Sequence, residues 1–573
     1  MAPMINRELS FIFDRMADIL ELKNENPFKI RAYRKAARII GDMTQDIVSI
    51  LEDGKLEKIP GVGEGMAKKI KEYVETRKMR KYEEVKASVP DELIEMLGIP
   101  SLGPRSLAQL HRKLEVRNMA ELKRAIEDGR VAGLKGFGAK KADNIMRGIA
   151  LLMGGMKRMP LGIAHPIAER IVTALKKNRS VRSIEAAGSL RRCCETIGDI
   201  DILAAGKNRK EIIRALVNLP GIKDVMAAGE TKASVRVDEG KQVDLRVVEE
   251  DSFGAALQYF TGSKEHNIKL REIARGKGLK LSEYGIFHKN RKIAGKTEEE
   301  VYGALGMEWI PPEIREDGGE IETAVSGNIP LLVGPKDIKG DLHVHTEWSD
   351  GTLSIGRIAA IAKKMKYRYV GVADHSRSLK IASGLSIEKV YEQMEAIDSM
   401  NRRLKGIRIL KGAEVDILSN GRLDYPDELL DTLDVVIASI HTGFAQPEAR
   451  ITGRILSAIE NPHVDIIAHP TGRLIGEREP YRVDMEKVMD AAAEHGKALE
   501  INAYYLRLDL NHLHCRMARD RGVKMAIGTD SHREEHFSWM KYGLAMARKG
   551  WLTKSDVLNT MTLEKLIRWL HRS

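Results

Sequence analysis

The sequence contains few cysteines, and none is placed for an ordinary disulfide framework. Its 573 residues include only three, Cys193, Cys194 and Cys515. The first two are adjacent, and neighbouring residues rarely satisfy the geometry of a disulfide. This cysteine usage is typical of a protein that works in a reducing compartment.

Long apolar runs are lacking as well. No run approaches the ~18 residues that would suggest a membrane-spanning helix. The first residues, MAPMINRELSFIFDRMADILEL, interrupt their apolar side chains with charges at helical spacing. This pattern predicts an amphipathic helix and not a signal peptide. We therefore expect a cytoplasmic protein with no membrane partner.

The chain is long and moderately basic. With roughly 100–200 residues per domain, a chain of this length predicts several domains. Lys and Arg number 94 against 82 Asp and Glu, which gives a net charge of +12 and a pI near 9.2. The charges are interleaved, so there is no basic tail. This balance fits a polyanionic partner such as nucleic acid and an unengaged basic surface equally well.

Residues 1–150 show helical patterns broken by three glycine-containing turns, at 59–63, 97–103 and 134–138. Glycine lets the backbone approach a phosphate, and the helix that follows offers free N–H groups. One such turn is also common between ordinary helices, but three on a basic chain favour DNA. The turns resemble helix-hairpin-helix motifs, which position DNA without reading its sequence. The candidate DNA-binding residues are Gly61, Gly63, Gly103, Gly136 and Gly138.

Strand-like segments between residues 180 and 250 carry a second constellation. Asp199 and Asp201 alternate along one strand and face the same side, and Asp244 lies in another strand. Three carboxylates on adjacent strands can hold two Mg²⁺ or Mn²⁺ ions for in-line nucleotidyl transfer. The Gly188-Ser189 turn and Arg192 supply groups for phosphate oxygens. A bare Asp-x-Asp usually marks a solvated strand end, but Gly-Ser followed by Gly-Asp-x-Asp resembles the nucleotidyltransferase fold.

Downstream, Tyr259-Phe-Thr-Gly-Ser263 and Asn267 resemble the nucleotide-binding segment of family X DNA polymerases, the polymerase beta type. The resemblance implies that Asp199, Asp201 and Asp244 are the catalytic carboxylates. It also implies a dNTP-binding set. In that set Ser189 and Arg192 hold the triphosphate, Tyr259 and Phe260 crowd the sugar, and Asn267 contacts the base edge. That set is Gly188, Ser189, Arg192, Tyr259, Phe260, Gly262, Lys264 and Asn267.

Two positions depart from the pattern of this family, and a third matches a lysine with a known role in it. Cys193 replaces the glycine usual after the paired arginines, and Lys264 stands where vertebrate relatives carry an aspartate. The lysine is positioned to add a phosphate or base contact. Lys69 matches the lysine with which polymerase beta relatives form a Schiff base on a 5′-deoxyribose phosphate. A phosphate-binding or solvated lysine is the alternative interpretation of Lys69.

The C-terminal part begins with GDLHVHTEWSDGT, Gly340–Thr352, and 12 of the 16 histidines lie after residue 339. Short apolar strands alternate with helices there, and nearly every strand ends in His, Asp or Glu. In a barrel of parallel strands, those ends form the active-site face. A lone histidine at a strand end is usually structural, but six strands with the same feature predict a site for two or three Zn²⁺, Mn²⁺ or Fe²⁺ ions. The candidate ligands are His343, His345, Asp350, His375, Glu414, His441, His469, Asp530 and His532.

These ligand motifs resemble the polymerase and histidinol phosphatase (PHP) domain, a distorted β/α barrel that hydrolyses phosphoesters. A family X polymerase joined to a PHP domain is the architecture of bacterial and archaeal polymerase X. The expected fold is therefore multidomain α/β, with helical DNA-binding regions, an α+β palm, a thumb and a barrel. The expected boundaries are 1–88 and 89–155 for the helical regions, 156–256 palm, 257–318 thumb, 319–338 linker and 339–573 PHP domain.

The sequence thus predicts a repair polymerase that fills short gaps in double-stranded DNA from dNTPs, with a 3′→5′ exonuclease on the same chain. The polarity of the nuclease follows from the resemblance alone, and we expect a monomer. One alternative is a template-independent nucleotidyltransferase fused to a small-molecule phosphoesterase, against which the Thr-Gly-Ser segment and the three turns argue. A DNA-binding scaffold with inactive sites is another, and the complete ligand sets argue against it.

Overall fold

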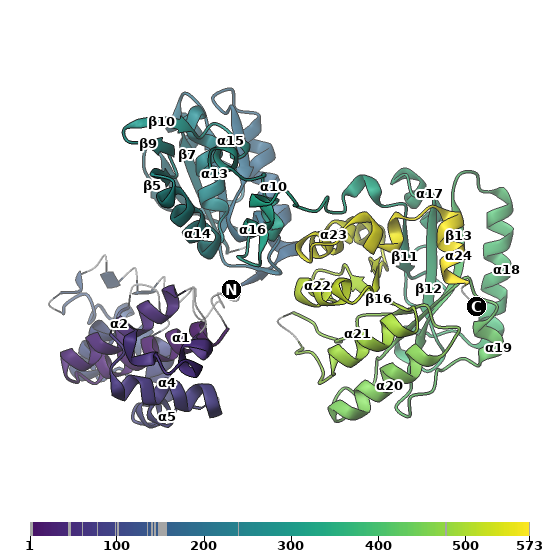
Figure 1. Cartoon of the computed structure of the whole chain (residues 1–573), viewed down its shortest axis with the longest axis horizontal. Coiled ribbons are helices and arrows are strands. Elements are labelled where there is room, and N and C mark those ends of the chain that lie inside the picture. Colours follow the sequence, from purple (N-terminus) through teal and green to yellow (C-terminus); the bar gives the residue numbers. More distant parts are fainter. Residues whose placement is uncertain are drawn as a thin grey trace. The chain divides into compact units, whose positions relative to one another are not determined.

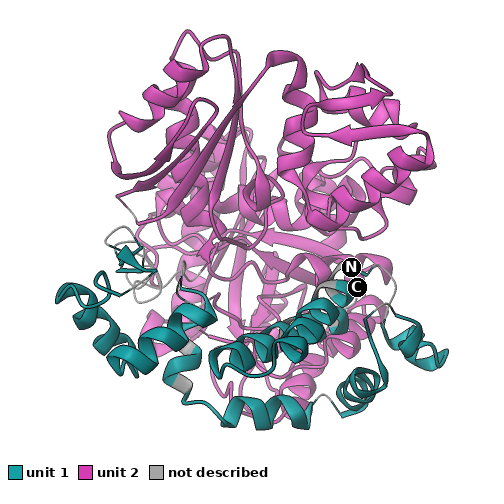
Figure 2. Ribbon diagram, turned by 90° about the vertical axis from the view of Figure 1, so that its left-hand side faces the viewer, with its two compact units in different colours: residues 1–157 teal, residues 158–573 magenta. Residues whose placement is uncertain are grey.

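The protein folds into two compact units, residues 1–157 and 158–573 (Figure 2). Within the part that the structure describes, no helix is both long enough and apolar enough to cross a membrane. The structure is a computed structural model, and it describes residues 4–43, 47–59, 61–76, 78–97, 99, 102–134, 136–138, 141–142, 145–146, 158–238, 240–475 and 478–571.

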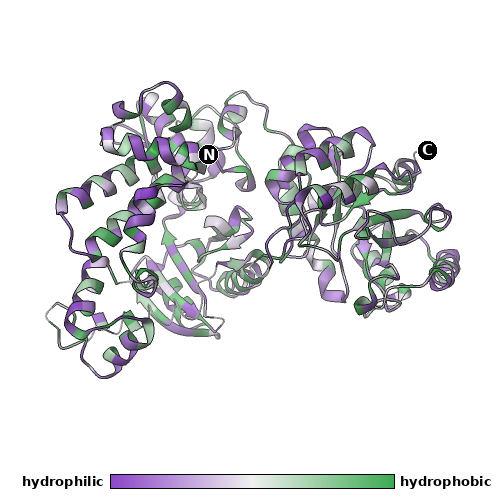
Figure 3. Cartoon of the chain, turned by 90° about the horizontal axis from the view of Figure 1, so that it is seen from below, coloured by the Kyte–Doolittle hydropathy of each residue, from purple (hydrophilic) through white to green (hydrophobic). Residues whose placement is uncertain are grey.

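The described part of the first unit consists of helices and turns. Apolar residues at helical spacing, such as Leu9, Phe13 and Met16, are fully buried, and each helix shows both hydrophobic and hydrophilic residues along its length (Figure 3). Asn26 and Asn118 cap two helices by accepting a hydrogen bond from a first-turn N–H. The helices are α1 Met4–Leu22, α2 Pro27–Asp42, α3 Ile47–Glu52, η1 Leu56–Lys58, α4 Glu64–Thr76, α5 Arg80–Ala87, α6 Asp91–Met96, α7 Pro104–Leu114 and α8 Met119–Glu127.

The second unit begins with the region expected to be the palm, called the palm region below. It is built around a five-stranded sheet of order β2-β4-β7-β6-β5, in which only β4 and β7 pair in parallel. Four of these strands confirm the sequence prediction. The edge strand β5 was not predicted, because its sequence IKDVMAA is half exposed and carries charges. The elements are β1 Met159–Pro160, α10 Leu161–Lys176, β2 Ser183–Ala186, α11 Gly188–Arg191, β3 Thr196–Ile197, β4 Ile200–Ala205, α12 Arg209–Val217, β5 Ile222–Ala228, β6 Lys232–Val237 and β7 Gln242–Val248.

A thumb region with its own core follows. The segment expected to be a linker, 319–338, contains α16 and packs against this core through Ile321 and Ala324, because its apolar residues find partners there. Glu320 in the same segment is buried and lies 2.7 Å from His266. The elements are η2 Glu250–Ser252, α13 Phe253–Thr261, α14 Lys264–Gly276, β8 Leu279–Ser282, β9 Gly285–His288, β10 Arg291–Ala294, α15 Glu298–Ala304, η3 Pro312–Ile314 and α16 Glu320–Val325.

The remaining residues form a parallel barrel of seven strands in the order β11 to β17, with helices around the strands (Figure 1). A parallel bridge between Val344 and Ser531 joins the ends of the first and last strands. The strands are apolar and buried on both faces, as expected for parallel strands covered by helices. They are β11 Gly340–Val344, β12 Tyr369–His375, β13 Arg408–Asp416, β14 Val435–Ser439, β15 Ile466–Ile467, β16 Ala498–Asn502 and β17 Lys524–Gly528.

The C-terminal helix α24 packs one face against the barrel interior and leaves the other exposed. Leu566, Trp569 and Leu570 pack with side chains that the strands point inward, such as Leu342 and Tyr369. The opposite, carboxyl-terminal ends of the strands therefore carry the polar side chains. The main helices of this region are α17 Ile355–Lys364, α18 Ile387–Arg403, α19 Asp427–Leu430, α20 Glu448–Glu460, α21 Met485–Glu494, α22 His512–Asp520, α23 Met540–Lys549 and α24 Leu563–Leu570; its short 3₁₀ turns are η4 Pro335–Asp337, η5 Lys380–Ala382, η6 Glu534–Trp539, η7 Lys554–Asp556 and η8 Leu558–Thr560.

Candidate active sites

All nine candidate ligands of the C-terminal region lie together at the carboxyl-terminal end of the barrel. The strand register explains part of this arrangement, because His375 and Glu414 are paired neighbours on β12 and β13. The barrel seam explains another part, because Asp530 N–H donates to the carbonyl of His343 at 2.9 Å. Eight of the nine, all except His469, form three overlapping groups of ligand atoms, with all atoms of a group within 4.8 Å of one another. His469 Nε2 lies 2.9 Å from Glu414 of the third group.

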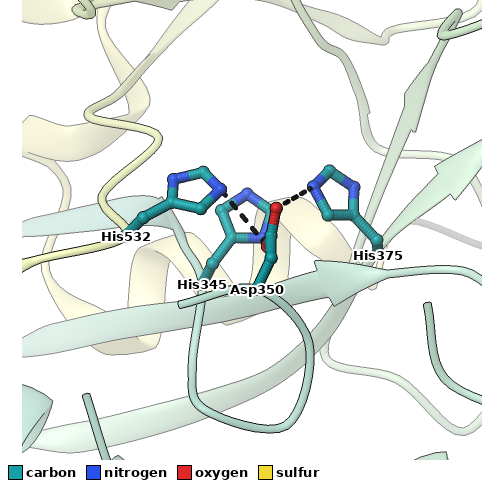
Figure 4. A group of neighbouring side chains, drawn as sticks. All are labelled: His345, Asp350, His375 and His532. Carbon is teal, nitrogen blue, oxygen red and sulfur yellow. Dashed lines mark ion pairs between the residues drawn. The ribbon is translucent and has the colours of Figure 1, made fainter. Parts of the chain in front are cut away.

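The first group surrounds Asp350, which the loop after β11 supplies. His375 and His532 turn toward its carboxylate, with His532 Nε2 3.3 Å from Oδ1 and His375 Nε2 3.7 Å from Oδ2 (Figure 4). His345 completes the group. Burial would raise the pKa of Asp350, but the hydrogen bond from His532 and the neighbouring imidazoles lower it to about 2.

Glu414 is the centre of the whole cluster and is 2% exposed. Burial would raise the pKa of its carboxyl, but the charges of the surrounding imidazoles hold that pKa well below its usual range. One carboxylate in contact with several imidazoles is suited to a ligand that neighbouring cations share. The ring nitrogens near its two oxygens belong to His343 at 3.5 Å, His345 at 3.7 Å, His375 at 2.9 Å, His441 at 3.4 Å and His469 at 2.9 Å.

Several ring nitrogens in this cluster fit a role as metal ligands. The Nδ1 atoms of His345 and His469 are buried and have no hydrogen-bond partner among the described residues. A buried polar nitrogen without a partner costs free energy, and a cation accepts its lone pair. The donor set of imidazoles and carboxylates suits Zn²⁺, Mn²⁺ or Fe²⁺.

Two carboxylates that the sequence analysis missed contact the Nδ1 atoms of two of these histidines. Glu500 Oε1 lies 2.7 Å from His343 Nδ1, and Asp416 Oδ1 lies 2.6 Å from His441 Nδ1. Such contacts fix the ring orientation and leave the other nitrogen for a metal. The signal was present for Asp416, which follows Glu414 by two residues and so shares its face of β13.

In the palm region the three predicted aspartates lie together and form a separate candidate metal site. Asp201 and Asp244 are direct partners in the parallel pair β4 and β7, and Asp199 precedes β4. Burial and then the charges of Asp199 and Asp244 raise the pKa of Asp201 to about 7. Lys232 Nζ lies 3.2 Å from Asp244. A divalent cation between these carboxylates would relieve their mutual repulsion, so the group fits metal binding.

The Gly-Ser turn lies directly against the aspartates. Gly188 has φ +61°, and a Cβ added there would lie 2.2 Å from Asp201 Oδ2, so only glycine fits. Ser189 follows in the short helix α11. Cys193 adopts φ +51°, the left-handed region that favours glycine, which gives a physical reason for the glycine usual at this position in the family.

The paired arginines have different carboxylate partners, Glu298 for Arg191 and Glu316 for Arg192. Arg191 makes two hydrogen bonds of 2.7 and 2.9 Å to the buried carboxylate of Glu298, which also binds Arg315. Arg192 instead donates to the carbonyl of Thr261, beside Gly262. Arg191 Nη1 also donates to the hydroxyl of Thr261 at 2.8 Å. Both arginines therefore contact the last residue of α13, Arg191 at its side chain and Arg192 at its backbone carbonyl.

The other predicted nucleotide residues gather at the same turn. Asn267 Nδ2 donates to the carbonyl of Tyr259 at 2.7 Å, and Phe260 stacks under the guanidinium of Arg246 at 4.6 Å. Lys264 is exposed at the start of α14. The set predicted from the sequence thus occupies two turns, 188–192 and 259–267, that the Arg192–Thr261 contact joins.

The helical unit holds the remaining candidates. Gly61, Gly136 and Gly138 have left-handed φ values of +86°, +92° and +64°, whereas Gly103 caps α7 with φ −72°. Gly63 directly precedes α4. The turns before α4 and α7 lead into helices as expected, and the described residues after Gly138, 141–142 and 145–146, are helical.

Lys69 lies on α4, and its Nζ donates to the carbonyl of Gly65 at 2.7 Å. Burial, and then the positive charges of Lys81 and Lys29, lower the pKa of its ammonium group. A lowered pKa makes the neutral, nucleophilic amine more available. The same cluster of lysines is also suited to a phosphate, so both interpretations of Lys69 keep a physical basis.

Four regions of the chain are similar to known domains. Family models match a helix-hairpin-helix domain at residues 4–79, a SAM-like helix-hairpin-helix tandem at 93–150, a DNA polymerase beta thumb at 256–316 and a PHP domain at 341–506. The DNA polymerase/3′-5′ exonuclease PolX of Bacillus subtilis is 41% identical over 575 residues, which cover 100% of both chains. The chain belongs to the PolX family.

PolX membership establishes the activities of this chain. It makes this protein a family X DNA polymerase with a 3′-5′ exonuclease, and it implies divalent metals and DNA binding through the helix-hairpin-helix and thumb domains. The barrel also matches proteins that lack the other regions. A probable phosphatase of Thermoanaerobacter sp. (strain X514) is 33% identical over 38% of this chain and 89% of its own, and one of Syntrophotalea carbinolica is 30% identical over 40% and 95%.

Proposed function

We propose that the two PolX activities belong to two separate metal sites, synthesis to the palm and 3′→5′ hydrolysis to the barrel. The observation that supports this most strongly is the pair of ligand groups on different sheets, three carboxylates on one and a His-rich cluster on the other. The palm group consists of oxygen ligands that suit two Mg²⁺ or Mn²⁺ ions. The barrel group suits two or three Zn²⁺, Mn²⁺ or Fe²⁺ ions.

In the palm, Asp199, Asp201 and Asp244 are the proposed catalytic carboxylates. Bound divalent cations would activate the 3′-hydroxyl and neutralise the triphosphate. Burial, and then the charges of Asp199 and Asp244, raise the pKa of Asp201, and a bound cation would favour its ionised form. The protein's own part is to hold all three oxygens on one side of β4 and β7, so that the reacting groups meet in line.

Nucleotide binding is assigned to the two joined turns. Gly188 and Ser189 offer a turn and a hydroxyl to phosphate oxygens, and Arg192 adds a charged donor. Tyr259 and Phe260 stand edge to face at 5.1 Å and would crowd the sugar. The remaining members of the set are Gly262, which lets the chain turn beside Arg192, Asn267 for the base edge and Lys264 for a phosphate or base contact.

In the barrel, the nine ligands His343, His345, Asp350, His375, Glu414, His441, His469, Asp530 and His532 are proposed to hold the ions of the exonuclease. Bound cations would supply a hydroxide near neutral pH and stabilise the oxygens of the phosphodiester. The chain's own groups orient the ring nitrogens through Glu500 and Asp416. The likeness of the barrel to probable phosphatases supports phosphoester chemistry here, but the full-length match to PolX favours DNA over a small-molecule substrate.

In the helical unit, Gly61, Gly63, Gly103, Gly136 and Gly138 mark the proposed contacts to the phosphates of gapped or primed duplex DNA. Their backbone N–H groups would approach the phosphates without reading bases. Lys69, with its lowered pKa, is the proposed nucleophile of a lyase step on a 5′-deoxyribose phosphate. We further propose that the protein fills short repair gaps in the cytoplasm as a monomer.

The test uses a one-nucleotide gapped duplex, Mn²⁺ and dNTPs. The Asp199→Ala/Asp201→Ala double variant should lose extension and keep 3′ trimming, and His343→Ala should do the opposite. His495→Ala, an exposed histidine after α21 in the same barrel, is the matched control and should keep both activities. Extension by the double variant, or trimming by His343→Ala at the normal rate, would contradict the assignment.

A further inference from the structure

Lys549, the last residue of barrel helix α23, is charged and yet only 5% exposed. Its Nζ donates to Glu316 Oε1, and to the carbonyl oxygens of Arg192 and Glu313 at 3.3 Å each. All three partners lie outside the barrel, in the palm and thumb regions. A buried ammonium group needs such partners, so Lys549 links the barrel to the polymerase half of this unit.

Glu316 is shared by two cations. Its Oε1 accepts from Lys549 and, at 3.1 Å, from Arg192 Nε. Burial would raise the pKa of this carboxyl, but the charges of Lys549 and Arg192 lower it to about 2. At neutral pH the network therefore contains two cations and one anion, and it keeps one net positive charge.

The other side of Arg192 faces the proposed nucleotide site. Its Nη1 donates to the carbonyl of Thr261 and lies 3.0 Å from the position that a Cβ on Gly262 would occupy. Gly262 has φ +73°, so the backbone turns there without a side chain in the way. A continuous set of contacts thus runs from the barrel helix to the turn that carries Tyr259 and Phe260.

We propose that Lys549 is a positioning residue for DNA synthesis, supplied by the barrel. The positive charge of Lys549 balances the negative charge of Glu316. The charge of Arg192 is then available to the triphosphate of the incoming dNTP. Without Lys549, Arg192 and Glu316 would form a neutral pair, and the triphosphate would meet less positive charge. This inference rests on the proposed role of Arg192, and it makes nucleotide affinity depend on a barrel residue that does not touch the nucleotide.

The same helix provides a matched control. Arg548, the preceding residue, also joins α23 to the thumb, but it points to Glu313 at 2.7 Å and to the carbonyl of Val333 at 3.0 Å. Removing Arg548 weakens the same interface without touching the ion pair between Glu316 and Arg192. A general loosening of the interface and a specific loss of charge compensation can therefore be told apart.

The experiment measures single-nucleotide insertion into a one-nucleotide gap by the full chain, with kcat and KM for the dNTP. Lys549→Met should raise KM about tenfold and change kcat by less than about twofold, as for a moderate coupling between a remote group and a binding site. Arg548→Met should leave KM within about twofold of the parent protein. Exonuclease activity, measured in parallel, should stay unchanged in both variants.

A second variant keeps the test decisive if Lys549→Met folds poorly. Lys549→Met/Glu316→Gln removes the buried carboxylate together with its cation, and it should restore KM to within about threefold of the parent value. The inference is overturned if the double variant is as impaired as Lys549→Met, or if Lys549→Met and Arg548→Met raise KM equally.

Arg192→Met separates this inference from the proposed function. A raised KM in Arg192→Met with a normal KM in Lys549→Met overturns the role of Lys549 alone. A normal KM in Arg192→Met overturns the triphosphate role of Arg192 and, with it, the inference.

Discussion

Replacing Glu298 with glutamine is expected to loosen the joint between palm and thumb. The carboxylate is buried and accepts paired hydrogen bonds from Arg191 of the palm and Arg315 of the thumb. Trp309 Nε1 adds a bond of 3.0 Å. Glutamine keeps the shape but leaves the buried guanidinium of Arg315 and the partly buried one of Arg191 without their anion, and unpaired buried charges are strongly destabilising.

The pKa of Glu298 gives the size and the sign of the effect. Burial would raise the pKa, but the two arginines lower it from 4.5 to about 2. At about 1.4 kcal/mol per pKa unit, the ionised carboxylate contributes roughly 3 kcal/mol. Because the folded-state pKa lies below the unfolded one, this contribution is complete well above pH 4.5 and declines as the pH falls toward 2.

The assay is hydrogen exchange of the peptides that cover residues 298–316, read by mass spectrometry in the full chain. At pH 7, Glu298→Gln should speed exchange of the slowest amides roughly a hundredfold. The difference in opening free energy between the parent protein and Glu298→Gln should be about 2 kcal/mol smaller at pH 3 than at pH 7. Glu299→Gln, an exposed neighbour on α15, is the control and should exchange like the parent. Equal protection in Glu298→Gln and Glu299→Gln at pH 7 would refute the reasoning.

Three further outcomes follow from the sites. Glu414→Gln should lower the amount of bound metal, measured by elemental analysis, and slow the exonuclease at least about a hundredfold while synthesis persists. Loss of a residue that only supports a metal ligand already costs about 10–100-fold, so loss of a ligand should cost more. Full metal content in this variant would contradict the assignment. Gly188→Ala should slow gap filling about a hundredfold, because its Cβ would displace Asp201, and a normal rate would argue against that geometry. Lys69→Ala should abolish borohydride trapping on a 5′-deoxyribose phosphate, with Lys68→Ala as the exposed control, and persistent trapping would exclude Lys69 as nucleophile.

The sequence predicted the barrel well, because its strands are continuous apolar runs that end in ligand residues. The segments around His375 and Glu414, for example, became β12 and β13 with these two residues side by side. Edge strand β5 was missed, since it is half exposed and lacks such a run. Helix α16 was taken for a linker because glycines and prolines surround its few apolar residues.

Pairings between distant residues could not be predicted. In the sequence, Glu500 is one carboxylate within a short apolar strand, and only the fold brings it 2.7 Å from His343, 157 positions earlier. The ion pair of Glu316 with Lys549 spans 233 positions and joins two regions. Local patterns report which face of a strand or helix a residue occupies, but they carry no information on which distant charge will meet it.

The central claim, two independent metal sites acting on the same DNA end, is tested most directly by idling turnover. A recessed primer is supplied with Mn²⁺ and only the next dNTP, which carries a radioactive label in its α-phosphate. Release of labelled dNMP, which can come only from a nucleotide that was first inserted, is measured over time. The parent protein should release dNMP steadily, because each inserted nucleotide is removed again. Asp199→Ala/Asp201→Ala and His343→Ala should each release almost none, and a mixture of the two should restore release. Turnover by either variant alone, or none by the mixture, would contradict the account.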